Sequence, residues 1–288
     1  MDTPLTLDFF FRRAESLFPH KELVTATATG IERSNYGQWA ERTRQLGGAL
    51  ADLGVSEYGR VGTFAWNTAR HHELYFAVPC TNRVLHTLNI RLFADQIVYI
   101  ANHAEDEVIF VDRSLMALLW PLVDQLETVR HLIVMDDGDG EVPDDPRVLD
   151  YEELLSSASP VNFEVKDEKQ AASMCYTSGT TGNPKGVVYS HRSTYMHTIT
   201  TMTADGLGVC ESDVILPVVP MFHVNSWGLQ HAAVAAGATL VNPGPKLQPE
   251  PIAELMESEK VTIAAGVPTI WMGVLEELDG RDLSLIHI

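Results

Sequence analysis

The chain has 288 residues, which suggests about two domains or one large unit. Hydrophobic residues make up 45% and charged residues 20%, so the chain can bury a core and lacks the composition of a disordered protein. Its 39 acidic residues against 20 Lys and Arg give a formal net charge of −19, which argues against a general nucleic-acid binder and against docking on an anionic membrane. An anionic small ligand stays open, because it needs only a local cluster of donors.

Cysteine usage and the N-terminal sequence favour a reducing, cytoplasmic location. Cys80, Cys175 and Cys210 are odd in number, far apart and without a CxxC pair, so they indicate neither a disulfide framework nor a thiolate zinc site. Residues 1–4 are not a basic segment leading into an apolar stretch, so we expect no secretory signal. The apolar stretch 232–241 is far too short to span a membrane, and we expect no transmembrane segment.

Apolar spacing predicts alternating helices and strands in the first half of the chain. In chain order we expect helices over 6–18 and 36–53, a strand over 61–66, helices over 71–78 and 93–102, a strand over 107–111, a helix over 115–126 and a strand over 131–135. Gly54 stands where a glycine commonly follows the end of a helix. This rhythm predicts a mostly parallel sheet covered by helices on both faces.

The alternation resumes in the second half. We expect strands over 171–176 and 186–190, a helix over 192–203, a strand over 214–216, a helix over 227–236, a strand over 239–241, a helix over 251–259, a strand over 261–264 and a helix over 269–278. The sequence thus predicts two similar α/β halves that meet near residues 160–170.

An acidic segment, 136–145, follows the strand expected over 131–135, and six of its ten residues are Asp or Glu. It lacks the alternating ligand positions and the closing Glu of an EF-hand. We interpret it as a solvated surface loop, because charge runs usually are.

One motif carries chemistry: residues 176–186 read Tyr-Thr-Ser-Gly-Thr-Thr-Gly-Asn-Pro-Lys-Gly. Its glycines let backbone amides approach a phosphate closely, and its four Ser and Thr hydroxyls add donors without bulk. Such hydroxyl oxygens also suit Mg²⁺, and Lys185 is a point charge suited to phosphate. The motif predicts an anion cradle between two strands. The alternative, an ordinary surface loop, would explain a shorter match better than this one.

Two other nucleotide-binding patterns do not fit. A Walker A loop needs Gly-Lys-Ser/Thr, but Lys185 follows Pro184 and precedes Gly186. No GxGxxG occurs, so a dinucleotide-binding Rossmann fold lacks its fingerprint.

The motif resembles the phosphate-binding loop of the acyl-adenylating enzymes, which include acyl-CoA synthetases, peptide-synthetase adenylation domains and beetle luciferases. The resemblance extends over nearly the whole chain, through segments 36–39, 88–91, 187–192 and 265–269. Residues 219–227, Val-Pro-Met-Phe-His-Val-Asn-Ser-Trp, resemble the fatty-acyl-CoA synthetase branch. In that branch such a His lies by the acyl-adenylate and such a Trp gates the acyl tunnel.

The resemblance implies a two-step reaction. A carboxylate attacks the α-phosphate of Mg·ATP to give an acyl-adenylate and pyrophosphate, and the thiol of coenzyme A then displaces AMP. It implies an acyl site formed by Val224 and Trp227, with His223 beside them as the catalytic residue. It also implies a phosphate site in the loop, where Thr177 would bind Mg²⁺. The implied phosphate-binding residues are Thr177, Ser178, Gly179, Thr180, Thr181, Gly182 and Lys185.

Each of these roles has a plainer alternative. A lone histidine in an apolar stretch, such as His223, is usually a satisfied core residue, and Trp227 taken alone is more often core than gate. No other histidines have the spacing of a zinc motif. Cys175 adjoins the loop, but cysteines beside strands are often simply buried.

The family's later motifs are not found in this sequence. We find no Tyr-Gly-x-Thr-Glu string, whose Glu would bind Mg²⁺, no Thr-Gly-Asp string, whose Asp would hold the ribose, and no lid with a catalytic lysine. We therefore expect part of a large N-terminal α/β domain with two mostly parallel sheets flanked by helices, without the C-terminal lid domain. Within it we expect a first subdomain over 1–165 and an incomplete second one, with the phosphate loop, over 166–282.

Residues 284–288 depart from the family pattern, and with Leu283 they read Leu-Ser-Leu-Ile-His-Ile. They match the translation of a transposon end used in preparing sequencing libraries. Our hypothesis is adapter read-through, and the alternative is a divergent natural terminus.

The resemblance implies ATP-dependent activation of a fatty or medium-chain acid, with this chain as an inactive fragment. Short methylthio-acids fit the same branch, so chain length stays open. One alternative is an adenylating protein that transfers its acyl group to a carrier-protein thiol, and another is a non-catalytic nucleotide-binding domain. The small-molecule partners implied are the acid, ATP and coenzyme A, and a homodimer is also open.

Overall fold

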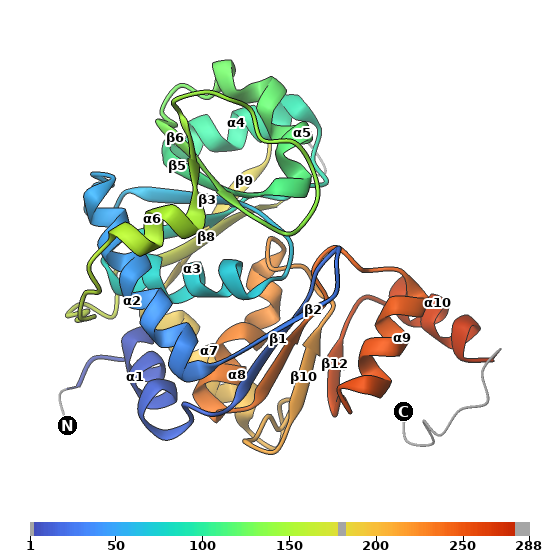
Figure 1. Ribbon diagram of the computed structural model, residues 1–288. Helices are drawn as coiled ribbons and strands as arrows, with labels where there is room; N and C mark the ends of the chain where they lie inside the picture. Colours follow the sequence, from blue (N-terminus) through green and yellow to red (C-terminus); the bar gives the residue numbers. More distant parts are fainter. Residues whose placement is uncertain (1–2, 178–182, 280–288) are drawn as a thin grey trace.

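The computed structural model describes residues 3–177 and 183–279. Its strands form two sheets, shown in Figure 1. The five-stranded sheet has the order β12 (Ile263–Ala265), β10 (Val214–Pro217), β11 (Thr239–Asn242), β1 (Glu22–Ala26), β2 (Ile31–Asn35). Neighbouring strands are parallel except for the antiparallel pair of β1 and β2.

The second sheet has seven strands in the described residues. Their order is β7 (Val148–Asp150), β6 (His131–Met135), β5 (Asp106–Asp112), β3 (Arg60–Phe64), β4 (Val84–Thr87), β8 (Ala171–Thr177), β9 (Lys185–Ser190). All pairs are parallel except β8 with β9. The expectation of two mostly parallel sheets flanked by helices is confirmed.

Helices fill three layers around the two sheets. The α-helices are α1 (Leu7–Leu17), α2 (Tyr36–Asp52), α3 (Ala69–Cys80), α4 (Ala94–Ala104), α5 (Met116–Leu119), α6 (Tyr151–Ser157), α7 (His191–Met202), α8 (Leu229–Ala236), α9 (Pro249–Ser258) and α10 (Pro268–Asp279). Side chains of α1, α2, α3 and α8 form one buried cluster with inner faces of both sheets. Helices α4 and α5 cover the outer face of the seven-stranded sheet, and α9 and α10 that of the five-stranded sheet.

Burial on both faces explains the uninterrupted apolar strands. In β5, Val108 and Phe110 pack into the central layer, whereas Ile109 and Val111 pack under α4 and α5. Successive side chains of a strand point to opposite faces, so a strand covered on both sides needs apolar residues throughout.

Local signals set the ends of α2. The Asn35 side chain accepts a hydrogen bond from the backbone N–H of Gln38 at 2.9 Å, and the Gln38 side chain accepts one from the backbone N–H of Asn35 at 3.2 Å. This reciprocal pair satisfies two donors that a helix start leaves free. Gly54 follows the last turn with φ of 65°, which confirms the glycine expected after the helix.

Two expected helices differ in the structure. The one expected over 115–126 is broken into the 3₁₀ segment η1 (Arg113–Leu115), the four-residue α5 and the 3₁₀ segment η2 (Trp120–Gln125). Pro121 lies at the start of η2, where it has no N–H to continue an α-helix and its ring would clash with the preceding turn. The helix expected from Trp227 begins instead at Leu229, because residues 224–228 adopt left-handed backbone conformations.

The division between the sheets does not follow the expected boundary at residues 165/166. Strands β1 and β2 join the later strands β10 to β12, and β8 and β9 join the earlier strands β3 to β7. The subdomains 1–165 and 166–282 therefore stay a prediction about folding units. Residues 283–288 lie outside the described residues. No helix within 3–177 and 183–279 has both the length and the apolar character needed to cross a membrane.

The central layer contains buried histidines, and we expect one of them, His72, to make the fold acid-sensitive. Burial lowers the pKa of His72 from 6.5 to about 3, so the folded state keeps it neutral. Between these values the unfolded chain binds a proton that the folded chain does not. Stability should fall by about 1.4 kcal/mol per pH unit from this group as the pH drops through that window.

His72→Phe should remove the contribution of His72 to the pH dependence of stability. The measurement is the free energy of unfolding in denaturant at a series of pH values between about 7 and 4. The control is His20→Phe, at an exposed position, which should leave the slope unchanged. Parallel slopes for His72→Phe and the parent chain would contradict the assignment.

Candidate functional site

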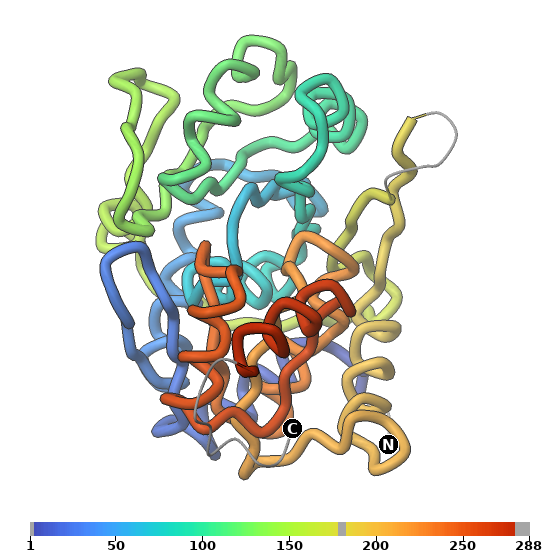
Figure 2. The backbone as a smooth tube through the Cα atoms, turned by 90° about the vertical axis from the view of Figure 1, so that its right-hand side faces the viewer, coloured from blue at the N-terminus to red at the C-terminus, as the bar shows by residue number. Residues whose placement is uncertain are grey.

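The expected phosphate loop joins β8 to β9, and its two ends lie side by side. Thr177 is paired with Lys185 across the antiparallel ladder, and both are exposed. The Thr177 hydroxyl donates to the Lys185 carbonyl at 3.5 Å. Paired residues project from the same face, so a hydroxyl and an ammonium group lie together at the end of this hairpin, which projects from the body in Figure 2. The other expected phosphate ligands, Ser178 to Gly182, lie outside the described residues.

A polar cluster around Tyr176 supports the base of the hairpin, and its members His86 and Asp106 are buried whereas His103 is exposed. The Tyr176 hydroxyl and His103 Nδ1 form a hydrogen bond of 2.6 Å, and the Tyr176 ring lies 5.1 Å from the ring of His86. His86 Nδ1 lies 2.8 Å from a carboxylate oxygen of Asp106, and both residues are fully buried. Burial raises the pKa of Tyr176 to about 12, so its hydroxyl stays protonated and can act as a donor. Sequence reasoning missed this cluster, because its members are far apart in the chain.

The segment after His223 adopts a left-handed turn. Val224, Asn225, Ser226 and Trp227 have φ between 47° and 54°, and Gly228 has φ of 74°. Left-handed backbone costs non-glycine residues about 1–2 kcal/mol each, so it persists only where surrounding structure holds it. This turn is the reason that α8 begins at Leu229 rather than at Trp227.

The contacts that hold the turn come from the strand of the phosphate loop. Asn225 Nδ2 donates to Ser173 Oγ at 2.9 Å, and the backbone amide of Val224 faces the sulfur of Cys175. Ser173 and Cys175 lie on β8, which ends at Thr177. The structure therefore ties the expected acyl segment to the expected phosphate hairpin through one strand.

Asn67 fixes the chain just before His223. Its Nδ2 donates to the carbonyls of Pro217 at 2.7 Å and Val219 at 2.9 Å, and its Oδ1 accepts from the backbone N–H of Met221 at 2.7 Å. Asn67 follows β3 in one sheet and Pro217 ends β10 in the other, so one buried amide joins the two sheets beside the site.

The expected site residues line two different cavities. Val224 and Trp227 line a cavity of about 390 Å³ together with Tyr189, His197 and His231. His223 instead lines a cavity of about 260 Å³, where Asn89 and Arg91 also lie. The structure therefore brings Val224 and Trp227 together but does not place His223 in their cavity.

Exposure within the described residues argues against the plainer alternatives for two of these residues. His223 is exposed, so it is not a satisfied core histidine. Trp227 is 39% exposed, which is incompatible with a simple core position. Cys175 is buried, in keeping with its plain structural alternative.

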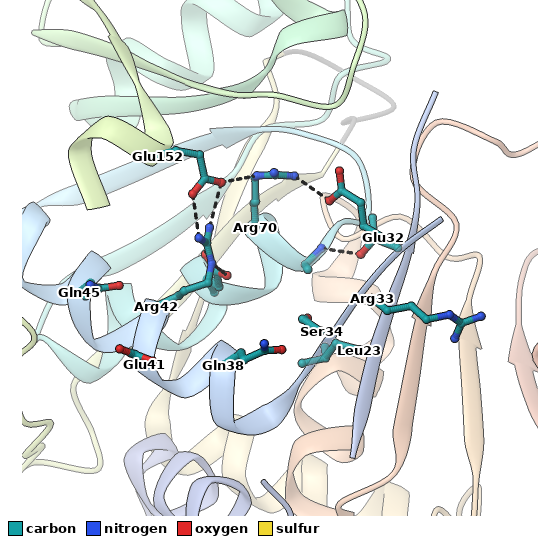
Figure 3. Close-up of a pocket in the computed structure, with 13 residues that line it drawn as sticks. Leu23, Glu32, Arg33, Ser34, Gln38, Glu41, Arg42, Gln45, Arg70 and Glu152 are labelled. Carbon is teal, nitrogen blue, oxygen red and sulfur yellow. Dashed lines mark hydrogen bonds and ion pairs between the residues drawn. The ribbon is translucent and has the colours of Figure 1, made fainter. Parts of the chain in front are cut away.

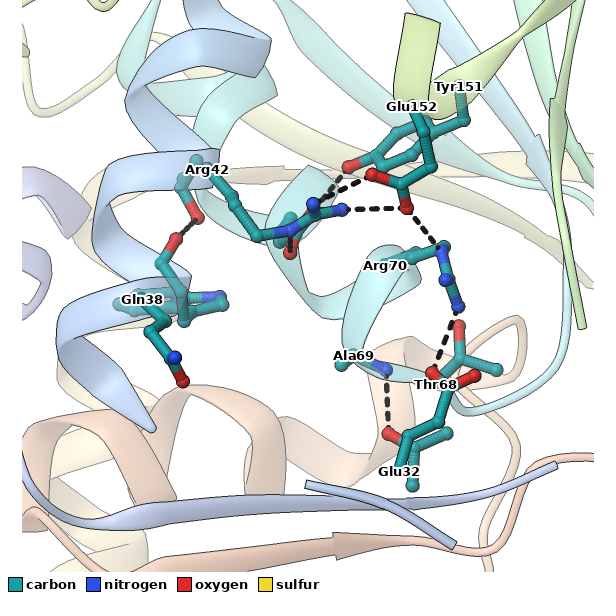
Figure 4. Close-up of polar contacts among 12 residues, drawn as sticks. Glu32, Gln38, Arg42, Thr68, Ala69, Arg70, Tyr151 and Glu152 are labelled. Atoms are coloured by element: carbon teal, nitrogen blue, oxygen red, sulfur yellow. Dashed lines mark hydrogen bonds and ion pairs between the residues drawn. The ribbon is translucent and has the colours of Figure 1, made fainter. Parts of the chain in front are cut away.

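A further cavity of about 450 Å³ contains none of the expected site residues. It lies among β1, β2, α2 and the start of α3 (Figure 3). Its charged side chains pair with one another: Arg42 contacts Glu73 at 2.6 Å and Glu152 at 2.8 Å, and Arg70 contacts Glu152 at 2.9 Å. Arg70 also reaches Glu32 at 3.2 Å, so the contacts form a continuous chain (Figure 4). We interpret this network as structural.

The acidic segment 136–145 is mostly exposed, as expected for a surface loop. Its buried member, Asp137, accepts a hydrogen bond from the Ser114 backbone N–H at 2.9 Å. Among residues 3–177 and 183–279, no group of three or more His, Cys, Asp or Glu is arranged to hold a metal ion.

Comparison with known proteins gives matches over nearly the whole chain. The sequence model of the family described as AMP-binding enzyme matches residues 11–287. The long-chain-fatty-acid–CoA ligase of Thermus thermophilus is 46% identical over 281 residues, 97% of this chain and 50% of that protein. The 3-methylmercaptopropionyl-CoA ligase of Ruegeria lacuscaerulensis is 42% identical over 278 residues, 96% of this chain and 52% of that protein.

Solved structures share the fold. The crystal structure of a long-chain-fatty-acid-CoA ligase from Archaeoglobus fulgidus matches with a TM-score of 0.84 at 24% identity, over 98% of this chain and 56% of that one. The chain thus spans about half the length of the curated relatives it matches.

Proposed function

The chain belongs to the AMP-binding enzyme family, and on that premise we propose that it carries the phosphate and acyl sites of an ATP-dependent acid–CoA ligase. The substrate class proposed is fatty or medium-chain carboxylic acids. The observation that carries the proposal is the connection through β8, which ends in the phosphate hairpin and also holds the turn of Val224 and Trp227.

The first step is an exchange of bonds at phosphorus. A carboxylate oxygen of the acid attacks the α-phosphorus of Mg·ATP, and the bond from that phosphorus to the bridging oxygen of the β-phosphate breaks. An acyl-adenylate forms and pyrophosphate leaves. In the second step the sulfur of coenzyme A attacks the acyl carbon, loses its proton, and AMP leaves.

The protein's part in the first step is positioning and charge neutralisation. Lys185 would offset negative charge on the phosphates, and Thr177 beside it would donate to a phosphate oxygen or bind the Mg²⁺ that enters with ATP. Within the described residues the hairpin offers a hydroxyl and a cation, so the other ligands of this Mg²⁺ would come from the nucleotide and from the rest of the complete enzyme.

The acyl chain would occupy the cavity behind the left-handed turn. Val224 and Trp227, which are 42% and 39% exposed, stand at its mouth. An indole there can present one face to the adenylate and the other to the acyl chain. His223, in the neighbouring cavity with Arg91, would lie on the nucleotide side of the same turn.

The proposal is tested by acid-dependent exchange of labelled pyrophosphate into ATP without coenzyme A. The protein for this test is this chain joined to the C-terminal half of one of its relatives, which we call the complete enzyme. Exchange that requires a fatty acid, followed by AMP release on adding coenzyme A, supports the proposal. Nucleotide binding without exchange would favour a non-catalytic domain. AMP release only with a carrier-protein thiol would favour acyl transfer to a carrier.

Trp227→Ala in the complete enzyme should broaden the range of accepted chain lengths and leave ATP binding largely unchanged. The reason is that the substitution opens the mouth of the acyl cavity without touching the phosphate hairpin. The measurement is kcat/KM for adenylate formation over a series of unbranched acids. An unchanged profile accompanied by loss of folding would show that Trp227 acts only in packing.

A further inference from the structure

His231 lies at the floor of the acyl cavity and is polar, buried and unpartnered. It lines the same cavity as Val224 and Trp227, but only 2% of its surface is exposed, against 42% and 39% for those two. Its Nδ1 is buried without a hydrogen-bond partner among the described residues. The difference in exposure places Val224 and Trp227 at the mouth of the cavity and His231 at its inner end.

The neighbours of His231 do not supply the missing partner. Its ring packs against the rings of Tyr75, at 5.6 Å, and Phe76, at 5.3 Å. Phe76 has no polar atom in its side chain, and the Tyr75 hydroxyl donates to the carbonyl of Met221. A buried imidazole normally has at least one partner, because an unpaired buried polar group costs about 1–3 kcal/mol.

The other polar groups of the cavity are engaged inside the protein or reach solvent; Tyr189, whose hydroxyl lies 4.0 Å from the Cys175 sulfur, is only partly buried. Ser193 Oγ and Thr194 Oγ1 donate to the carbonyl of Ser190, at 3.0 and 3.1 Å. Asn225 donates to Ser173, and its Oδ1 accepts from Thr87. The remaining imidazole, His197, is exposed and can be satisfied by solvent. Within the described lining, His231 is therefore the buried group with hydrogen-bonding capacity to spare.

We propose that His231 selects acids that carry a neutral polar group, such as a hydroxyl, ether or keto oxygen, in the part of the acyl chain farthest from the carboxylate. This inference rests on the proposed function, since it takes the cavity of Val224 and Trp227 as the acyl site. The carbon chain would run from the mouth past these two side chains and bring its distal oxygen to the imidazole.

The charge state of His231 limits the class of distal group. Burial lowers its pKa to about 3, so the imidazole is neutral near pH 7 and offers one donor and one acceptor. His197 and His191 would also disfavour a cation here. A second carboxylate would lack a cationic partner, so dicarboxylic acids are not the substrates proposed.

The test compares pairs of acids with equal numbers of non-hydrogen atoms, an n-alkanoate and the ω-hydroxyalkanoate in which a hydroxyl replaces the terminal methyl. The ratio of their kcat/KM values for adenylate formation is measured in the complete enzyme. His231→Phe should lower the ratio of hydroxy acid to alkanoate by about fivefold to tenfold, the worth of one net hydrogen bond. The change should lie in KM rather than kcat, because the distal group is remote from the reacting atoms.

Two variants separate this role from packing. His231→Gln keeps a donor and an acceptor and should retain much of the preference. His72→Phe alters a buried imidazole of the same cluster that does not line the cavity, and it should leave the ratio unchanged. If His231→Phe does not fold, ¹⁵N spectra of the histidine rings in the 288-residue chain replace it. The ring nitrogens of His231 should shift with the hydroxy acid and not with the alkanoate.

The possible results separate the role of His231 from the proposed function of the chain. If alkanoates and hydroxy acids are both activated and the ratio is the same in parent and His231→Phe, the role of His231 is overturned while the proposed function stands. An absence of adenylate formation with every acid would overturn both. Equal ring-nitrogen shifts with both kinds of acid would also overturn the role of His231.

Discussion

The 288-residue chain by itself, incubated with ATP, Mg²⁺ and a panel of fatty acids, is expected to release no pyrophosphate above background. Its described phosphate hairpin supplies one ammonium group and one hydroxyl, and the chain spans about half the length of its curated relatives. Removing one donor that stabilises a transition-state charge costs about 10²–10³ in rate. The rate effects of catalytic groups that act together are not independent, so the loss of several such groups should abolish turnover.

The control for this experiment is the same chain joined to the C-terminal half of one of its relatives. That protein should release pyrophosphate when an acid is present. Rapid release from the 288-residue chain alone would contradict the division of roles, because residues described here would then suffice for the chemistry.

Lys185→Ala in the complete enzyme should lower kcat/KM for adenylate formation by about 10²–10³ and leave thermal stability nearly unchanged. Lys185 is exposed at the end of a hairpin, and an exposed cation contributes little to folding. Its expected work is on the phosphates, where charge develops as the bond to pyrophosphate breaks.

Lys169 offers a matched control. It is an exposed lysine just before the opposite end of β8, so Lys169→Ala changes the net charge equally but at a distance from the phosphate hairpin. It should leave adenylate formation unchanged. Equal losses for the two variants would mean that overall charge, rather than a local contact, is responsible. Normal activity with a much lower melting temperature for Lys185→Ala would assign Lys185 to folding.

Local sequence signals predicted much of the fold. The expected helix over 36–53 has a capping pair at its start and Gly54 after its end, and both signals act within a few residues. The apolar run 107–111 predicted a buried strand, because the covering of both sheet faces demands that pattern. These elements depend on neighbours along the chain or on burial, which a sequence shows directly.

Features that depend on distant contacts were missed. Strands β1 and β2 were not predicted, and β1 gains its place by pairing with β11, more than 200 residues later. The helix expected over 227–236 was placed to begin inside the left-handed turn of residues 224–228. Four of its five residues are not glycine, and their backbone is held by Ser173 and Cys175 from another strand.

The roles of the candidate site residues stay predictions, and the sequence did not show how these residues are arranged. Thr177 and Lys185 are paired across β8 and β9, whereas His223 lines a different cavity from Val224 and Trp227. His231 had no spacing of a known motif, so sequence reasoning set it aside. Its position at the floor of a cavity arises only from the packing of α8 against the aromatic residues of α3.

The most direct test of the proposed function follows one oxygen atom. The complete enzyme is supplied with ATP, coenzyme A and a fatty acid labelled with ¹⁸O in its carboxylate, and the AMP released is analysed by mass spectrometry. Attack of the carboxylate on the α-phosphorus leaves one carboxylate oxygen on the phosphate, so each AMP should carry one ¹⁸O. Unlabelled AMP, or ADP together with ¹⁸O-labelled phosphate, would contradict activation through an acyl-adenylate.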